Sequence, residues 1–284
     1  LGSLVCSNFG PTDSSWNLMI PELMIHIGEV SGDYAGMRVI NDSKRVWRVS
    51  EDGEIRDLTK KLELVFKGDL KSFFKNASIE IEPGAESFYN IWKNSDKKFR
   101  DEFKNLNLPF SNLWIASEIY NRFPEKSVLN FAILNSLRTW NFFKLHNSIR
   151  TFCNVGGFGI DGCLSTSIGG ALAKKNLMHF LIIGDLAFFY DINAILNRHF
   201  PKNLRIILIN NGGGIEFKNY SHMASEIKID ANELIAAGGH FNSELMVSQK
   251  FQHLKLDLKI LWLELGVINS ISIISQHLIK KNLN

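Results

Sequence analysis

Short apolar runs alternate with helix-like segments along the second half of the chain, and this rhythm constrains the fold more than any other feature. HFLIIGD (residues 179–185) and LRIILINN (residues 204–211) have the character of strands, and a helix-like segment lies between them. Strands that alternate with helices of this length are typical of βαβ units. The sequence therefore predicts an α/β fold with a mostly parallel sheet flanked by helices.

Further elements complete the predicted sheet. Strands are expected over residues 127–133 and 150–155, and helices over residues 114–123, 165–175 and 186–200.

The first part of the chain predicts a separate, smaller unit. Strands are expected over residues 21–28, 37–40 and 45–50, and helices over residues 70–76 and 88–106. Residues 1–75 are too few for a complete α/β domain, so we assign them to part of a smaller α/β domain. Residues 76–95 contain proline and glycine and are interpreted as a linker, and residues 96–284 as the main domain. Because the chain begins at Leu1 and not at methionine, we expect it to be a piece of a longer protein.

Composition argues against several classes of protein. The net charge of the 284 residues is +3 and the basic residues are scattered, so no nucleic-acid partner is expected. Apolar runs are too short to span a membrane, so no membrane partner is expected either. Cys6, Cys153 and Cys163 form no CxxC pair, which is typical of a reducing compartment, and we expect the protein in the cytoplasm.

Polar residues and glycines directly follow two of the predicted strands. Asp185 ends the first strand, and Asn210, Asn211 and a glycine run that begins at Gly212 end the second. Ligands of open parallel sheets lie beyond the carboxyl ends of the strands, and one helix separates these two strands, so their ends are expected to share a crevice. A carboxylate, an amide oxygen and a backbone carbonyl suit Mg²⁺, which takes further ligands from water and phosphate.

The helix predicted after Asp185 adds an element that binds anions, since the free N–H groups of a first turn favour phosphate. We therefore interpret the segment as a Mg²⁺-diphosphate site. The plainer interpretation is that Asp185 only caps this helix and that Asn-Asn-Gly is an ordinary turn.

The segment GDLAFFYDINAIL, followed by NNGGGIEF, resembles the signature of thiamine diphosphate enzymes. It is most similar to the synthases that make 2-succinyl-5-enolpyruvyl-6-hydroxy-3-cyclohexene-1-carboxylate, as are residues 157–173 and 134–143. The resemblance covers roughly residues 110–240, and residues 15–75 resemble, more weakly, the end of the family's middle domain. It implies the thiamine diphosphate-binding fold, with thiamine diphosphate and Mg²⁺ as cofactors.

The resemblance also assigns residues to the site. Asp185 matches the first metal ligand, Asn210 the second and the carbonyl group of Gly212 the third, while Asn211 and Gly213 form an alternative register. Cofactor contacts are assigned to Ser136, Gly159, Ile160, Gly184, Leu186, Ala187 and Ile215. In the family, the residue at the place of Ile160 props the cofactor in a bent shape, although plain core packing would explain this residue as well.

Two residues are candidates for catalysis. In related decarboxylases a glutamate at the place of Glu216 contacts the substrate, whereas the plainer interpretation is an exposed residue at the start of a helix. His222 lies beyond the glycine run and could transfer a proton. The family's activating glutamate belongs to an N-terminal domain that we match to no segment here, so an absent part of the protein or a partner chain is expected to supply it.

The resemblance implies a carboligase or decarboxylase, that is, a transferase or lyase acting on a 2-oxo acid and an acceptor. The family holds acidic substrates with two arginines, and those places are taken here by Trp140 and Val155, with Arg138 close enough in sequence to substitute. Since the family's cofactor lies at a subunit interface, a homodimer or homotetramer is expected.

Two alternatives stay open. One is a non-catalytic subunit that binds the cofactor. The other is a nucleotide-binding oxidoreductase, because GFGIDG (residues 157–162) also matches G-x-G-x-x-G, with Asp185 at the distance of a ribose contact.

Overall fold

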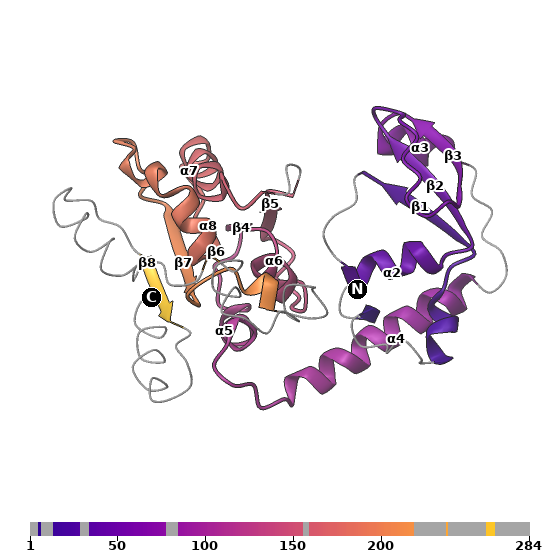
Figure 1. The fold of residues 1–284 in the computed structure, drawn as a ribbon, viewed down its shortest axis with the longest axis horizontal. Helices are drawn as coiled ribbons and strands as arrows, with labels where there is room; N and C mark the ends of the chain where they lie inside the picture. The colour runs from indigo at the N-terminus through magenta and orange to yellow at the C-terminus, as the bar shows by residue number, and fades with distance from the viewer. Residues whose placement is uncertain are drawn as a thin grey trace. The chain divides into compact units, whose positions relative to one another are not determined.

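The computed structural model describes residues 5–6, 14–28, 34–77, 85–155, 159–218, 237 and 260–264. The chain divides into two compact units, Leu1–Asn107 and Leu108–Asn284, and each unit is described by itself (Figure 1). None of the helices in the described ranges has both the length and the apolar character that crossing a membrane requires.

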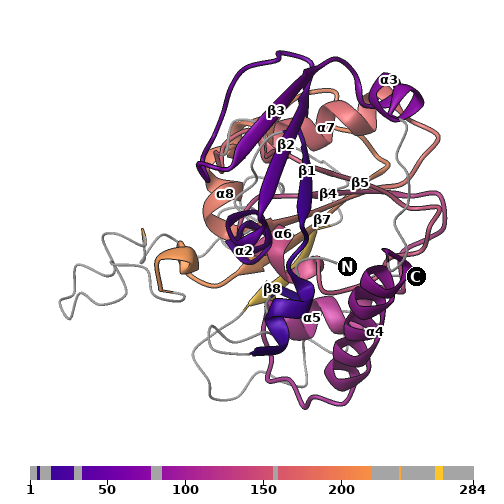
Figure 2. The same ribbon diagram turned by 90° about the vertical axis from the view of Figure 1, so that its right-hand side faces the viewer.

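The first unit is built on a small parallel sheet, whose strands lie side by side in Figure 2. The strand order is β1 (Leu23–Ile27), β2 (Arg45–Ser50) and β3 (Leu62–Lys67). The helices are η1 (Ser14–Met19), α2 (Tyr34–Asp42), α3 (Leu70–Asn76) and α4 (Ala85–Lys104). The strands expected at residues 21–28 and 45–50 and the helices expected at 70–76 and 88–106 are thus confirmed.

The strand expected at residues 37–40 is wrong, because these residues belong to α2. A short apolar run does not distinguish a strand from a helix, and tertiary contacts decide between them. Here the buried Val39 packs in a cluster with Trp16, and the indole N–H of Trp16 donates to Asp42 Oδ2 at 2.6 Å. These contacts favour the helix.

The same cluster shows why α4 belongs to the first unit. Trp92 of α4 packs against the cluster, with its ring centroid 6.5 Å from that of Trp16. The structure therefore divides after Asn107, whereas the sequence placed a linker at residues 76–95 and the second domain from residue 96.

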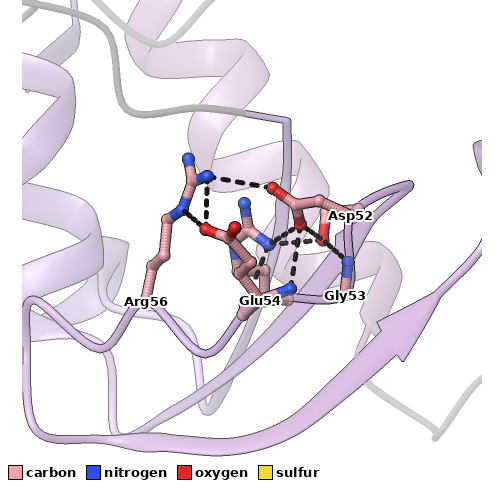
Figure 3. A network of polar contacts seen from close by, with 6 residues as sticks. Asp52, Gly53, Glu54 and Arg56 are labelled. Carbon is pink, nitrogen blue, oxygen red and sulfur yellow. Dashed lines mark hydrogen bonds and ion pairs between the residues drawn. The ribbon is translucent and has the colours of Figure 1, made fainter.

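Polar contacts around Asp52 organise the turn after β2 (Figure 3), and a buried arginine takes part in them. The side chain of Arg48 is 1% exposed and donates to Asp52 Oδ1 at 3.0 Å, to the carbonyl oxygen of Glu54 at 3.1 Å, and to the hydroxyl of Ser50. A buried cation is tolerated only with such partners. Hydrogen bonds from Ser50, from the Glu54 backbone and from Arg48 hold the pKa of Asp52 well below its usual range. This network is a structural feature of the turn.

The second unit contains a five-stranded sheet in which each observed pairing is parallel, which confirms the α/β prediction. The strand order is β5 (Arg150–Cys153), β4 (Val128–Phe131), β6 (His179–Gly184), β7 (Leu204–Asn210) and β8 (Ile260–Glu264). The strands expected over residues 127–133, 150–155, 179–185 and 204–211 are therefore present. The edge strand β8 comes from the far end of the chain, where the sequence predicted no element.

Helices cover both faces of this sheet (Figure 1). On one face, residues of α5 (Asn112–Ile119) and α6 (Asn135–Trp140) pack on Phe180 and Ile182. On the other face, residues of α7 (Cys163–Ala173), α8 (Asp185–Tyr190) and η2 (Ile192–Leu196) pack on Leu181 and Ile183. Successive residues of β6 thus point to opposite faces of the sheet. Both faces are covered by apolar packing, which explains why the strand is apolar almost throughout.

The single helix expected over residues 186–200 is wrong in its extent. The α-helix α8 ends at Tyr190, and η2 follows as a 3₁₀ helix. Asp191 lies at the break, with φ −122°, and its Oδ2 accepts from the backbone N–H of Ser165 at 2.6 Å. A side chain that reaches across to α7 in this way competes with continuation of the helix.

The order of the strands creates a switch point. From β4 the chain moves to β5 on one side and then returns to β6 on the other side of β4. In open parallel sheets, such a reversal leaves a crevice beyond the carboxyl ends of the two strands, and ligands bind there. By this rule, a ligand site is expected beyond the ends of β4 and β6, next to Asp185.

Burial of His179 generates a prediction about pH. The residue is 2% exposed at the start of β6, and burial lowers its pKa. Below about pH 6.5, the ordinary pKa of histidine, the unfolded chain takes up a proton that the folded chain resists. The free energy of unfolding should therefore fall as the pH drops below that value. In urea titrations between pH 8 and 5, His179→Leu should show a weaker pH dependence than the wild type, and identical slopes would contradict this account.

Candidate functional site

The carboxylate of Asp185 is the centre of the candidate site. Asp185 begins α8 directly after β6 and is 1% exposed. Its Oδ2 accepts hydrogen bonds from the backbone N–H groups of Asn211 at 3.1 Å and Gly212 at 2.6 Å, and its Oδ1 accepts from its neighbour Leu186 at 2.8 Å. Because β6 and β7 are adjacent and parallel, their ends meet at one edge, as the sequence predicted.

The side-chain amide of Asn211 lies close to two oxygen atoms of the site. One atom of its terminal amide lies 3.2 Å from Asp185 Oδ1 and 2.8 Å from the carbonyl oxygen of Gly213. If this atom is the nitrogen, it donates to both oxygens. If it is the oxygen, three oxygens from three residues face one another, and a cation between them would satisfy all three. The donor set therefore fits a hard divalent ion.

This arrangement corresponds to the alternative register, with Asn211 and Gly213. Asn210, the first choice from the sequence, ends β7 opposite Glu264. Gly212 serves the site through its N–H group and has a φ of 81°, a conformation that favours glycine. Within the described residues, no group of three or more His, Cys, Asp or Glu side chains could hold a metal ion.

The other residues that were predicted to contact the cofactor lie in segments that follow the ends of strands. Ser136 is 5% exposed in α6, which follows β4. Gly184 caps α8, Ala187 is buried in α8, and Ile215 begins η3 (Ile215–Lys218). Topology thus brings these segments to one edge of the sheet. The N–H group of Leu186, expected to meet a diphosphate, donates to Asp185 in this structure.

The loop before α7 is partly described. Ile160 packs against the core beneath α7, as its plainer interpretation predicted, and the side chain of Asp161 lies against Gly159. Gly162 caps α7 with a φ of 74°, and the side-chain amide of Asn154 donates to its carbonyl oxygen at 3.1 Å. Residues 156–158 and the catalytic candidate His222 lie outside the described residues.

Two supporting residues escaped the sequence analysis. Asn154 holds the carbonyl of Gly162, and Asp191 holds the first turn of α7 through Ser165. An asparagine two residues before a glycine-rich loop is a signal that could have been used. Asp191 has no comparable signal, because it stands in a segment that looks continuously helical.

The strand order argues against the dinucleotide interpretation. In that motif the strands before and after the glycine-rich turn and its helix are neighbours. Here the turn lies between β5 and β6, and β4 separates these two strands. The carboxylate of Asp185 is also engaged by the chain that follows β7.

Glu216 and Arg138 meet at the same edge. Arg138 Nη1 in α6 donates to Glu216 Oε2 in η3 at 2.5 Å, and the side chains are 20% and 17% exposed. Glu216 lies in the first turn of η3, as its plainer interpretation predicted, but the expected exposure is wrong, since its side chain is mostly buried in an ion pair.

The contacts of Asp185 predict a structural cost of losing its charge. An amide has one oxygen, so Asp185→Asn cannot accept from all three N–H groups, and we expect the free energy of unfolding to fall by about 2 kcal/mol. Asp161→Asn, which changes an exposed carboxylate of the same unit, should change stability by less than about 0.5 kcal/mol. Urea denaturation measures both, and equal effects would contradict a special role for Asp185.

Replacing Leu134 is expected to raise the free energy of unfolding, whereas replacing Asp185 is expected to lower it. It precedes α6 at the candidate site with φ 62° and ψ −128°, a region in which a leucine side chain is strained. Glycine tolerates this conformation, so Leu134→Gly should raise the free energy of unfolding by about 1 kcal/mol after its own entropic cost. A decrease in thermal or urea stability would show that the contacts of the leucine side chain outweigh the strain.

Comparison with known proteins identifies relatives with one shared name. The synthase from Bacteroides fragilis named 2-succinyl-5-enolpyruvyl-6-hydroxy-3-cyclohexene-1-carboxylate synthase is 36% identical over 202 residues, covering 69% of this chain and 35% of the relative. The protein of that name from Flavobacterium psychrophilum is 34% identical over 225 residues, covering 73% of this chain and 38% of the relative. The one from Christiangramia forsetii is 38% identical over 122 residues, covering 43% and 21%.

No family model matches the chain. The chain covers 35% to 38% of the length of the Bacteroides and Flavobacterium relatives. Identities of this size over about 70% of the chain establish common descent. The protein is therefore a homologue of the 2-succinyl-5-enolpyruvyl-6-hydroxy-3-cyclohexene-1-carboxylate synthases over the part of their length that it covers.

Proposed function

We propose that the second unit binds the diphosphate group of thiamine diphosphate through Mg²⁺, as part of an enzyme that forms or cleaves a carbon–carbon bond of a 2-oxo acid. The observation that carries the proposal is the meeting of Asp185, Asn211 and the Gly213 carbonyl at the switch point of the sheet. The name shared by the relatives supports synthesis of a cyclohexene carboxylate by such chemistry.

The metal site would use Asp185 Oδ1, the amide oxygen of Asn211 and the carbonyl oxygen of Gly213. Three oxygen ligands leave part of an octahedral shell open, and diphosphate oxygens and water are suited to fill it. In the first turn of α8, backbone N–H groups favour negative charge. This donor set distinguishes the proposal from a zinc or copper site, which would use histidine or cysteine.

Bound thiamine diphosphate would supply the carbon nucleophile, so the chain's own residues need to orient and shield it. Ser136, Gly159, Ile160, Gly184, Leu186, Ala187 and Ile215 are our candidates for contacts with the cofactor. The carboxylate of Asp185 is buried, and the low local dielectric strengthens its electrostatic contacts. Glu216 and His222 stay predictions for contact with the reacting groups.

The aligned part of this chain covers 35% of the relative from Bacteroides fragilis, so we propose that the complete activity also uses segments that this chain does not match. We propose a homodimer or homotetramer, a small-molecule 2-oxo acid and an acceptor as substrates, and a cytoplasmic location that suits the free thiols of Cys6, Cys153 and Cys163. If the protein binds the cofactor but catalyses no reaction, it is better described as a non-catalytic subunit that binds the cofactor.

Titration calorimetry with thiamine diphosphate, with and without Mg²⁺, tests the proposal. We expect binding that requires Mg²⁺ and that weakens about tenfold in Asn211→Ala, since a metal ligand is lost. Asn210→Ala is the matched control and should bind within about twofold of the wild type. Equal loss in the two variants would contradict the assignment of Asn211. Binding that ignores Mg²⁺, or a preference for NAD, would contradict the proposed function.

A further inference from the structure

The ion pair between Arg138 and Glu216 joins two segments that are 78 positions apart in the sequence. Its atoms lie 2.5 Å apart, and both side chains are about four-fifths buried. An arginine–carboxylate contact in such surroundings is stronger than a surface ion pair, because solvent screens it less. The pair therefore forms a firm connection between α6 and η3.

The position of η3 matters because this helix directly follows residues 211–214, here called the 211–214 loop. Asp185 anchors the first half of this loop through the N–H groups of Asn211 and Gly212. Its second half, Gly213 and Gly214, has no side chain that could anchor it. Glu216 lies two residues further along the chain and ties the far end of the loop to α6.

A hydrogen bond connects η3, which carries Glu216, to the carbonyl oxygen that is proposed as a metal ligand. The backbone N–H of Ile215 donates to the carbonyl oxygen of Gly213 at 3.1 Å, and the same oxygen lies 2.8 Å from the amide of Asn211. Movement of η3 would thus displace the Gly213 carbonyl. At the other end of the pair, α6 is fixed to the sheet, because Trp140 is 3% exposed and its ring packs 5.6 Å from that of Phe131.

Several other basic residues near this sheet are placed differently. Lys126, Arg150, Lys174 and Lys202 precede or begin strands, so they lie toward the amino edge of the parallel sheet. Arg138 follows β4 and lies at the carboxyl edge, where the 211–214 loop is. An arginine at this edge, already engaged by a carboxylate, is suited to hold a loop in place.

We infer that the Arg138–Glu216 ion pair is a positioning element, which holds the Gly213 carbonyl in register with Asp185 and Asn211. This inference rests on the proposed metal site for its functional meaning. It assigns Glu216 a role that requires no contact with substrate. Neither residue touches the metal in this scheme, and both act through the backbone of the 211–214 loop.

The test compares Arg138→Gln, Glu216→Gln, the two combined, and the charge-swapped pair Arg138→Glu with Glu216→Arg. Hydrogen exchange of the peptide spanning residues 209–216 reports the order of the loop without any ligand. Each single variant should exchange about tenfold faster in this peptide and bind thiamine diphosphate with Mg²⁺ about five- to tenfold more weakly. The combined variant should be no worse than the single ones, and the charge-swapped pair should recover part of both losses.

Arg122→Gln is the matched control, since it removes an exposed arginine that lies 3.6 Å from Glu118 in the same unit. It should leave loop exchange and cofactor affinity unchanged. Urea denaturation of each variant separates a local effect from a global one. Unchanged loop exchange, or exchange that rises equally in all peptides, would overturn the inference. If the wild type fails to bind thiamine diphosphate while loop exchange responds as expected, the proposed function fails and the positioning role stands.

Discussion

The buried carboxylate of Asp185 is the contact on which the candidate site depends. It is 1% exposed, and an unpaired charge at such a depth would be costly. Backbone N–H groups of Leu186, Asn211 and Gly212 stabilise it, and through them the carboxylate joins the end of β6 to the chain that leaves β7. A residue that first looks like a helix cap therefore organises two strand ends at once.

The surrounding fold makes this contact possible. Both faces of the sheet are covered, so its strands are fixed by apolar packing and their ends hold constant positions. The strand order reverses between β4 and β6, which is where open parallel sheets bind their ligands. Supporting contacts, from Asn154 and Asp191 on one side and from Arg138 on the other, then hold the flanking loops. Rigid strands and anchored loops are what a binding site for a metal and a diphosphate requires.

Errors in the sequence-based predictions share a physical cause. Residues 37–40 were expected to form a strand, and residues 186–200 a single helix, from local pattern alone. In the structure, a tryptophan contact decides the first case and a carboxylate that reaches α7 decides the second. The choice between Asn210 and Asn211 was left open by the sequence, since both follow the same strand and their sequence neighbourhoods are nearly equal. The intrinsic preference of a segment for helix or strand is weak, and contacts between segments distant in the sequence outweigh it.

By itself, the sequence determined the α/β class, the strands that carry polar ends and the residue types that suit Mg²⁺ and a diphosphate, because these follow from periodicity and from chemistry near one point in the chain. Only the tertiary structure decided the order β5-β4-β6-β7-β8, the meeting of Asp185 with Asn211 and the pairing of Arg138 with Glu216. These features depend on which strands become neighbours. Packing of the whole sheet fixes that choice, and no single segment encodes it.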